Sequence, residues 1–115
     1  MMIYITTKFH GKVGNGHGEF VIAGGDPVKG FSGEIKDVSW PRFNALVCLT
    51  AVQNVPAGET LTLTLQDAYA ASMIASGHCE GANTDVWEKV YDRIHGFKAF
   101  KVVRDKNHRL VSWKP

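Results

Sequence analysis

The stretch TLTLTLQDAYAASMIA, residues 60–75, changes its hydrophobic period within a few residues. Residues 60–65 alternate threonine with leucine, which predicts a β-strand with its leucines on one face. Asp67 follows this strand and can cap a short helix over 68–75, which Gly77 would end. Parallel strands need a crossover connection, and that connection is usually a helix. The stretch therefore predicts a parallel part of a sheet that is covered by helices.

The residues before this stretch have the pattern of antiparallel hairpins. Strands are predicted over 3–7, 20–23 and 31–36, where β-branched and aromatic residues are concentrated. The glycines within 11–18 predict the turn between the first two strands, because glycine gives the backbone conformational freedom. Over 41–52 a proline is followed by apolar residues at three- and four-residue spacing, which predicts a helix.

After residue 75 the chain has the pattern of a polar loop, a helix and a strand. The loop covers 76–83, and Thr84 or Asp85 is predicted to cap a helix that ends at Gly96. Residues 99–103 form the last predicted strand. The predicted order is βββαβααβ, an α/β fold in which a mixed sheet carries helices on its faces. A chain of 115 residues is predicted to form a single domain.

The composition is that of a globular protein. With 44% apolar and 21% charged residues, a mainly disordered chain is excluded. No apolar run approaches the roughly 18 residues that a membrane span needs, and the first residues lack the pattern of a signal peptide. Cys48 and Cys79 do not have metal-type spacing. We therefore expect reduced thiols, a cytoplasmic location and no membrane partner.

Charge is distributed unevenly along the chain. Residues 1–86 carry five basic and eight acidic side chains, whereas residues 87–115 carry eight basic and three acidic ones. A basic end can mark a surface that contacts phosphates, and it can equally be a solvated face without a function.

The order of elements, together with four segments, resembles the ribonuclease H family. The segments are Gly14-Asn15-Gly16-His17-Gly18, the spacing from Lys29–Gly33 to Arg42–Leu46, Leu63–Tyr69, and Asn83–Val90, which is similar to the Asn-x-Asp-Leu-Trp helix start of that family. The resemblance covers nearly the whole chain and implies a ribonuclease H-like fold that is truncated at its C-terminus, because the last helix of the family has no counterpart.

The resemblance also implies that the catalytic acids are absent. Ribonuclease H activity depends on carboxylates that hold two magnesium ions. The first-strand aspartate of the family falls near Thr7, or on His10 if the turn is shifted. The first-helix glutamate falls on Asn44, and the fourth-strand aspartate falls on Gln66, one position before Asp67. We therefore expect no catalytic residue, no metal and no cofactor at these positions.

A fold that lacks its catalytic groups is predicted to act by binding. Its partner is expected to be nucleic acid or a protein. The candidate residues for nucleic acid are Asn15, Lys89, Arg93, Lys101 and Arg104, and those for a protein are Trp40, Trp113 or an exposed sheet edge. The size of the chain and the missing acids fit an accessory protein of a phage or mobile element, such as an inhibitor of a host nuclease system. The alternative is an active metal-dependent nuclease with displaced acids.

Other chemistry-bearing residues have simpler interpretations. Asp67 is expected to act as a helix cap. His10 and His17 flank the predicted glycine turn and, with Cys79, could supply zinc ligands, but their spacing is unspecific and loop histidines are the expected alternative. Cys48 and Trp87 lie on apolar helical faces and are expected in the core.

Overall fold

The computed structural model describes residues 1–25, 29–77 and 81–106. The order of elements is βββαβααβ, as predicted. The strands and helices are β1 (Met2–Lys12), β2 (Asn15–Gly24), β3 (Lys29–Val38), α1 (Trp40–Gln53), β4 (Thr60–Leu65), α2 (Ala68–Ser76), α3 (Thr84–His95) and β5 (Ala99–Arg104).

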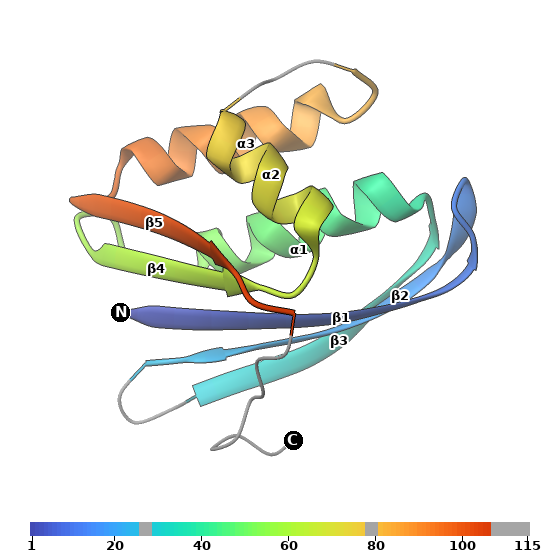
Figure 1. Cartoon of the computed structure of the whole chain (residues 1–115), viewed down its shortest axis with the longest axis horizontal. Coiled ribbons are helices and arrows are strands. Elements are labelled where there is room, and N and C mark those ends of the chain that lie inside the picture. The colour runs from blue at the N-terminus through green and yellow to red at the C-terminus, as the bar shows by residue number, and fades with distance from the viewer. Residues whose placement is uncertain (26–28, 78–80, 107–115) are drawn as a thin grey trace.

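The strands form one mixed sheet in the order β3-β2-β1-β4-β5 (Figure 1). The pairs β1–β2 and β2–β3 are antiparallel, whereas β4 runs parallel to both β1 and β5. The predicted combination of an antiparallel meander with parallel strands is therefore confirmed, and the chain has a mixed α/β fold.

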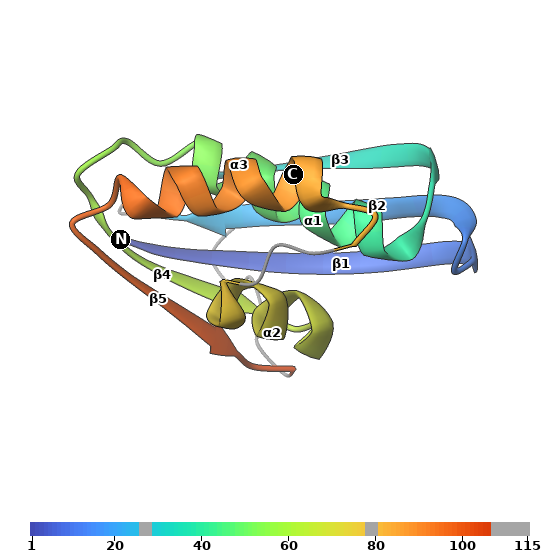
Figure 2. The ribbon, with the colours of Figure 1, turned by 90° about the horizontal axis from the view of Figure 1, so that it is seen from above.

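The three helices of the described residues all lie on one face of the sheet, as Figures 1 and 2 show, whereas the prediction was a sheet with helices on its faces. Helix α1 packs on β1, β2 and β3, helix α2 packs on β4 and β5, and helix α3 packs on α1. The chain moves across the sheet in one direction from β1 to β4 to β5. Crossover connections have a fixed hand, so successive crossovers in the same direction pass over the same face.

The glycine-rich segment differs from its prediction as a turn over 11–18. Strands β1 and β2 continue through it, and Lys12 pairs with Asn15 across a tight turn at Val13-Gly14. Gly16 and Gly18 lie inside β2, where neighbouring atoms leave no room for a side chain. A Cβ atom at Gly18 would lie 2.2 Å from the Phe43 ring. Gly18 therefore permits α1 to approach the sheet closely.

The core lies between the sheet and the helices. The largest fully buried side chains are Trp87, Phe43, Leu61, Leu63, Val47, Val52, Val55, Val90 and Cys48. The predicted core positions of Cys48 and Trp87 are therefore confirmed. The Trp87 indole N–H is buried and has no hydrogen-bond partner among the described residues.

Helix ends follow the predicted signals in part. Asp67 caps α2, and Gly77 ends it in the left-handed conformation. The N-cap of α3 is Asn83 and not Thr84 or Asp85, and the Asn83 side chain makes no capping hydrogen bond. Instead Asn83 and Asp85 accept hydrogen bonds from the Arg42 guanidinium on α1. Hydrogen bonds from Arg42 on the neighbouring helix α1 thus fix the start of α3.

No helix in the described parts of the chain is long and apolar enough to cross a membrane.

Candidate functional site

Thr7, Asn44, Gln66 and Asp67 line one small cavity. Thr7 lies in β1 and Asn44 in α1, while Gln66 and Asp67 connect β4 to α2. Strands β1 and β4 are parallel, so their carboxyl ends point toward the same edge of the sheet. The cavity has a volume of about 10 Å³, which is close to the space that one water molecule needs. The structure therefore brings together the four positions that the resemblance singled out.

The chemistry of this cavity is nearly neutral. Asp67 is the one carboxylate among the described residues that line it, and its Oδ2 accepts a hydrogen bond from the Ala70 N–H at 2.9 Å. The buried Asn44 amide donates to the Trp40 carbonyl at 3.0 Å. Magnesium prefers several carboxylate and other oxygen ligands, and these groups offer a single carboxylate that already caps a helix. The arrangement fits a structural role and does not supply charge for two metal ions.

The Cys48 thiol lies against the same cavity. Burial raises the pKa of this thiol to about 12, and the Asp67 carboxylate adds to the rise. A thiolate, and not a thiol, is the nucleophile in cysteine chemistry. Cys48 is therefore an unreactive core residue.

The raised thiol pKa predicts a loss of stability at alkaline pH. In the unfolded chain Cys48 ionises near its ordinary pKa, about 9, whereas in the folded state it stays protonated until about 12. The stability that the protonated Cys48 thiol gives to the fold is therefore complete below pH 9 and is lost as the pH rises toward 12. We expect the free energy of unfolding to fall by up to about 1.4 kcal/mol per pH unit in this window. Urea unfolding near pH 8 and pH 10 measures this change.

Cys48→Ala is the control, because it removes the ionisable group. The variant should be less stable at neutral pH but should lose less stability than the wild type between the two pH values. Equal pH dependence in both proteins would show that the thiol does not contribute.

The predicted nucleic-acid residues come from three different elements, β2, α3 and β5. Arg93 donates hydrogen bonds to the carbonyls of Val55 at 2.6 Å and Val52 at 3.3 Å, where α1 ends. Arg104 donates to the Gln66 carbonyl at 3.3 Å. Two of the candidate cations thus interact with backbone carbonyls within the fold.

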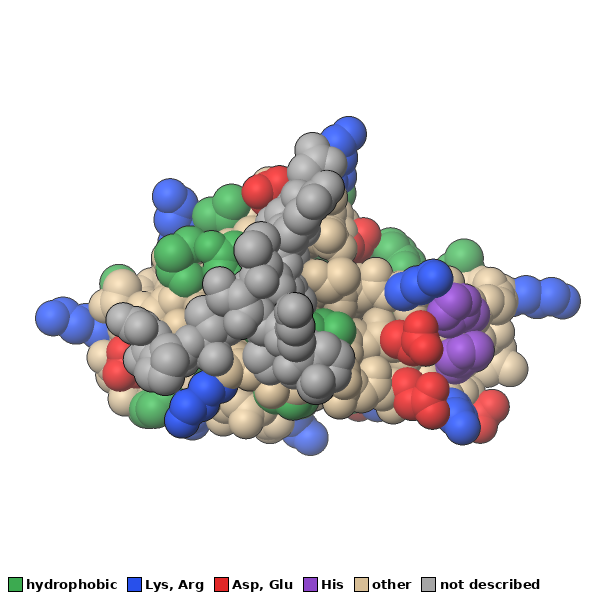
Figure 3. All heavy atoms as spheres, turned by 90° about the horizontal axis from the view of Figure 1, so that it is seen from below, with side chains coloured by type: hydrophobic (Ala, Val, Ile, Leu, Met, Phe, Trp, Pro, Cys, Tyr) green, Lys and Arg blue, Asp and Glu red, His purple; other side chains and the backbone are tan. Residues whose placement is uncertain are grey.

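The remaining candidates, Asn15, Lys89 and Lys101, are exposed and belong to three different elements. Lys101 pairs with Thr62, on the opposite face of the sheet from Leu65 and its partner Arg104. Lys89 lies on α3, and Asn15 lies at the β1–β2 turn. Figure 3 shows the face of the sheet opposite the helices, where basic side chains are scattered and acidic ones lie among them.

The predicted protein-binding tryptophans are only partly described. Trp40 opens α1 and packs against Tyr69 of α2, with ring centroids 5.0 Å apart, so this ring contributes to packing between the two helices. Trp113 lies outside the described residues.

An ion pair between Arg42 and Asp85, at 2.9 Å, joins α1 to α3. The side-chain hydrogen bond from Arg42 lowers the pKa of the Asp85 carboxyl.

The histidines of the first hairpin pair across the strands. His10 lies opposite His17 with the rings stacked at 4.9 Å, and His10 Nε2 lies 3.2 Å from Glu19 Oε2. These histidines lie in strands and not in a loop, because the strands continue through the glycine-rich segment. Cys79, the further zinc ligand considered, lies outside the described residues. Within residues 1–25, 29–77 and 81–106, no group of three or more histidine, cysteine or acidic side chains is arranged to hold a metal ion.

Sequence reasoning missed the role of Arg93 and an apolar cavity near the start of β3. Arg93 lies on α3, and its acceptors, the carbonyls of Val52 and Val55, are about 40 residues away in sequence, so no local signal identifies them. No family model matches the chain, and comparison with curated proteins finds no match.

Proposed function

We propose that this chain is a ribonuclease H-like protein without catalytic activity that acts by binding. The observation that carries the proposal is the meeting of Thr7, Asn44 and Gln66 in one cavity, because the resemblance implies acids at these positions. The strand order β3-β2-β1-β4-β5 and the parallel pairing of β1 with β4 support the same interpretation. The chain would keep the framework of the family and lack the carboxylates of its chemistry.

A protein partner is the class that the geometry favours. Strand β3 lies at the edge of the sheet, and no strand of the described residues pairs with its outer side. It is ten residues long, and most of its side chains are exposed. An exposed edge strand offers unpaired backbone groups to which an extended segment of another protein can add. Lys101 and Arg104 lie on opposite faces of the sheet, which makes nucleic acid the weaker candidate.

The role of an accessory protein, such as an inhibitor of a nuclease system in a phage or mobile element, is consistent with binding without catalysis. A cytoplasmic location is part of the same proposal, and the buried free thiol of Cys48 agrees with reducing conditions.

A binding and hydrolysis assay tests the proposal. We expect no cleavage of an RNA–DNA hybrid with magnesium or manganese. We also expect dissociation constants weaker than about 0.1 mM for duplex, hybrid and single strands at low salt, which is poorer than ordinary non-specific binding. Fluorescence anisotropy at two salt concentrations gives these constants.

Two results would contradict the proposal in different ways. Tight binding that weakens steeply with salt, and that is lost in a Lys101→Gln, Arg104→Gln variant, would make nucleic acid the partner. Hybrid cleavage that Asp67→Asn abolishes would establish the alternative, an active nuclease with displaced acids. Asp67→Asn keeps a side-chain oxygen for the α2 cap, so its effect on folding should be small.

A further inference from the structure

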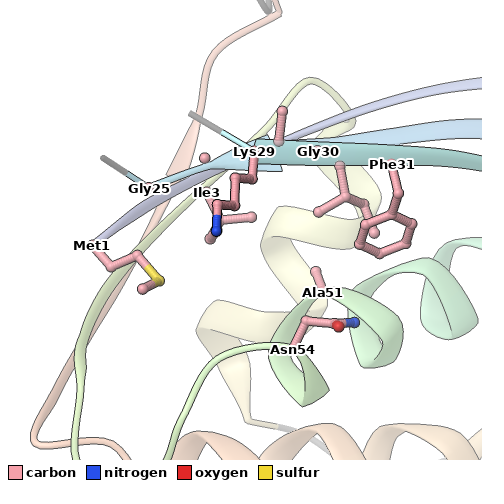
Figure 4. Close-up of a pocket in the computed structure, with 11 residues that line it drawn as sticks. Met1, Ile3, Gly25, Lys29, Gly30, Phe31, Ala51 and Asn54 are labelled. Carbon is pink, nitrogen blue, oxygen red and sulfur yellow. The ribbon is translucent and has the colours of Figure 1, made fainter. Parts of the chain in front are cut away.

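A larger cavity lies between the sheet and the C-terminal end of α1 (Figure 4). Its volume is about 430 Å³, within the usual range of small-molecule sites. It involves Ile3 near the start of β1 and Asn54 after the end of α1, whereas the Thr7 and Asn44 cavity lies toward the other ends of these elements. The two cavities are therefore separate.

The walls of this cavity are apolar and belong to four elements. Ile3 and Ile22 come from β1 and β2, Phe31 comes from β3, and Ala51 forms the side toward α1. Phe31 is 37% exposed and Met1 is 45% exposed, so large apolar side chains remain in contact with water around the hollow. An apolar group that enters the cavity would remove this surface from water.

The polar groups around the cavity favour an anion. Lys29 is the one charged side chain among the described residues that line it. Figure 4 shows this side chain extending from β3 toward the space between the sheet and α1. Lys29 takes part in no ion pair with the described residues, in contrast to Lys36 on the same strand, which lies 3.4 Å from Glu34. The Asn54 amide lies on the opposite side, and its Nδ2 donates a hydrogen bond to the Thr50 carbonyl at 2.7 Å.

We propose that this cavity binds a small amphipathic monocarboxylate, such as a medium-chain aliphatic acid. The tail packs among Ile22, Phe31 and Ala51, and the carboxylate lies at the Lys29 ammonium. This ligand matches these observations, because the volume and the apolar walls accept the tail and the Lys29 ammonium accepts the head group. The N-terminal ammonium of Met1, which also lines the cavity, donates to the Thr60 carbonyl at 2.7 Å. The proposal goes beyond the proposed binding function, since it involves neither the β3 edge pairing nor the cavity at Thr7.

Nuclear magnetic resonance titration of the whole chain tests this site with three probes that share one tail. These probes are octanoate, octanol and octylammonium. We expect saturable shifts of the backbone amides around the cavity, with octanoate binding at about 1 mM or tighter, octanol more weakly and octylammonium weakest. The amides to follow are those of Gly24, Gly30, Phe31 and Ala51.

Paired lysine variants separate the charge from general basicity. Lys29→Gln should weaken octanoate binding by about threefold and leave octanol binding unchanged, whereas Lys36→Gln should change neither. Ala51→Leu should fill the cavity and abolish binding of both probes. If this variant does not fold, the lysine pair still decides the question.

Three outcomes would overturn the proposal. The first is the absence of saturable shifts at these amides, which removes the site. The second is equal binding of all three probes, which makes the cavity a non-selective apolar hollow. The third is an equal effect of Lys29→Gln and Lys36→Gln, which removes the assigned carboxylate contact. None of these results bears on hybrid cleavage or nucleic-acid binding, so the proposed function is tested separately.

Discussion

Replacing Gly18 by alanine is expected to destabilise the fold by about 2–4 kcal/mol. The added Cβ atom would lie 2.2 Å from the Phe43 ring, a distance that non-bonded carbon atoms do not reach. Phe43 is only 1% exposed and packs against Phe9 with ring centroids 5.6 Å apart, so its ring has little room to move. Either α1 must shift from the sheet or the ring must leave its position. Urea unfolding followed by circular dichroism measures the loss.

The same segment supplies a matched control. A Cβ atom at Gly14 would meet nothing within 4 Å, so Gly14→Ala should change the free energy of unfolding by less than about 1 kcal/mol. Phe43→Leu in the Gly18→Ala background should recover part of the loss, because leucine leaves space for the new methyl group, and a double-mutant cycle quantifies the coupling. Equal effects at Gly14 and Gly18 would mean that Gly18 is not a packing position.

Introducing acids at the cavity of Thr7 should make the stability of the protein depend on magnesium. In the variant Thr7→Asp, Asn44→Glu, Gln66→Asp, three new carboxylates would join Asp67 around one small cavity. Without metal, their mutual repulsion and the burial of the residue at position 44 should destabilise the fold by about 3 kcal/mol or more. Bound magnesium offsets this repulsion, and a concentration 100 times the dissociation constant would restore about 2.7 kcal/mol.

Thermal unfolding with and without magnesium measures this dependence. The matched control is Thr7→Asn, Asn44→Gln, Gln66→Asn, which places neutral side chains of similar size at the same positions. We expect no effect of magnesium on the control or on the wild type. If magnesium leaves the melting temperature of the acidic variant unchanged, the four side chains do not converge as ligands, and the proposed relation to ribonuclease H loses its main support.

The order of elements was predictable because its signals are local. Threonine–leucine alternation over 60–65 and the Asp67 cap specify a strand and a helix from neighbouring residues alone. The same holds for Gly96, where α3 ends, and for the strand that follows it. Mixed strand directions then follow, because hairpins give antiparallel pairs and a strand–helix–strand connection gives a parallel one.

The roles of Gly18 and Arg93 were not predictable from their surroundings in the sequence. A glycine in a turn and a glycine under an aromatic ring have the same local signal, and the ring that distinguishes them is Phe43, on another element. Arg93 has the appearance of a surface cation on α3, yet it binds carbonyls of Val52 and Val55. Its acceptors are backbone groups, which carry no sequence signal at all.

Some features of the candidate site likewise follow from the sequence, and others depend on tertiary structure. The absence of acids at Thr7, Asn44 and Gln66 is a property of the sequence, whereas their meeting in one cavity depends on β1 pairing with β4 beneath α1. The cavity beside Lys29 and Phe31 depends wholly on tertiary packing, because its walls come from two hairpin strands, an edge strand and the end of a helix.

The sequence by itself determined the types and order of the elements, the core positions of Cys48 and Trp87, and the neutral side chains at positions 7, 44 and 66, since each follows from hydrophobic period, capping chemistry or residue identity. Tertiary structure alone decided which face of the sheet the helices cover. It also decided which basic side chains donate hydrogen bonds to backbone carbonyls, and where the cavity beside Lys29 lies. The physical reason is that burial and hydrogen bonding between distant elements depend on how their side chains fill space in three dimensions, and the neighbours of a residue along the chain do not specify this.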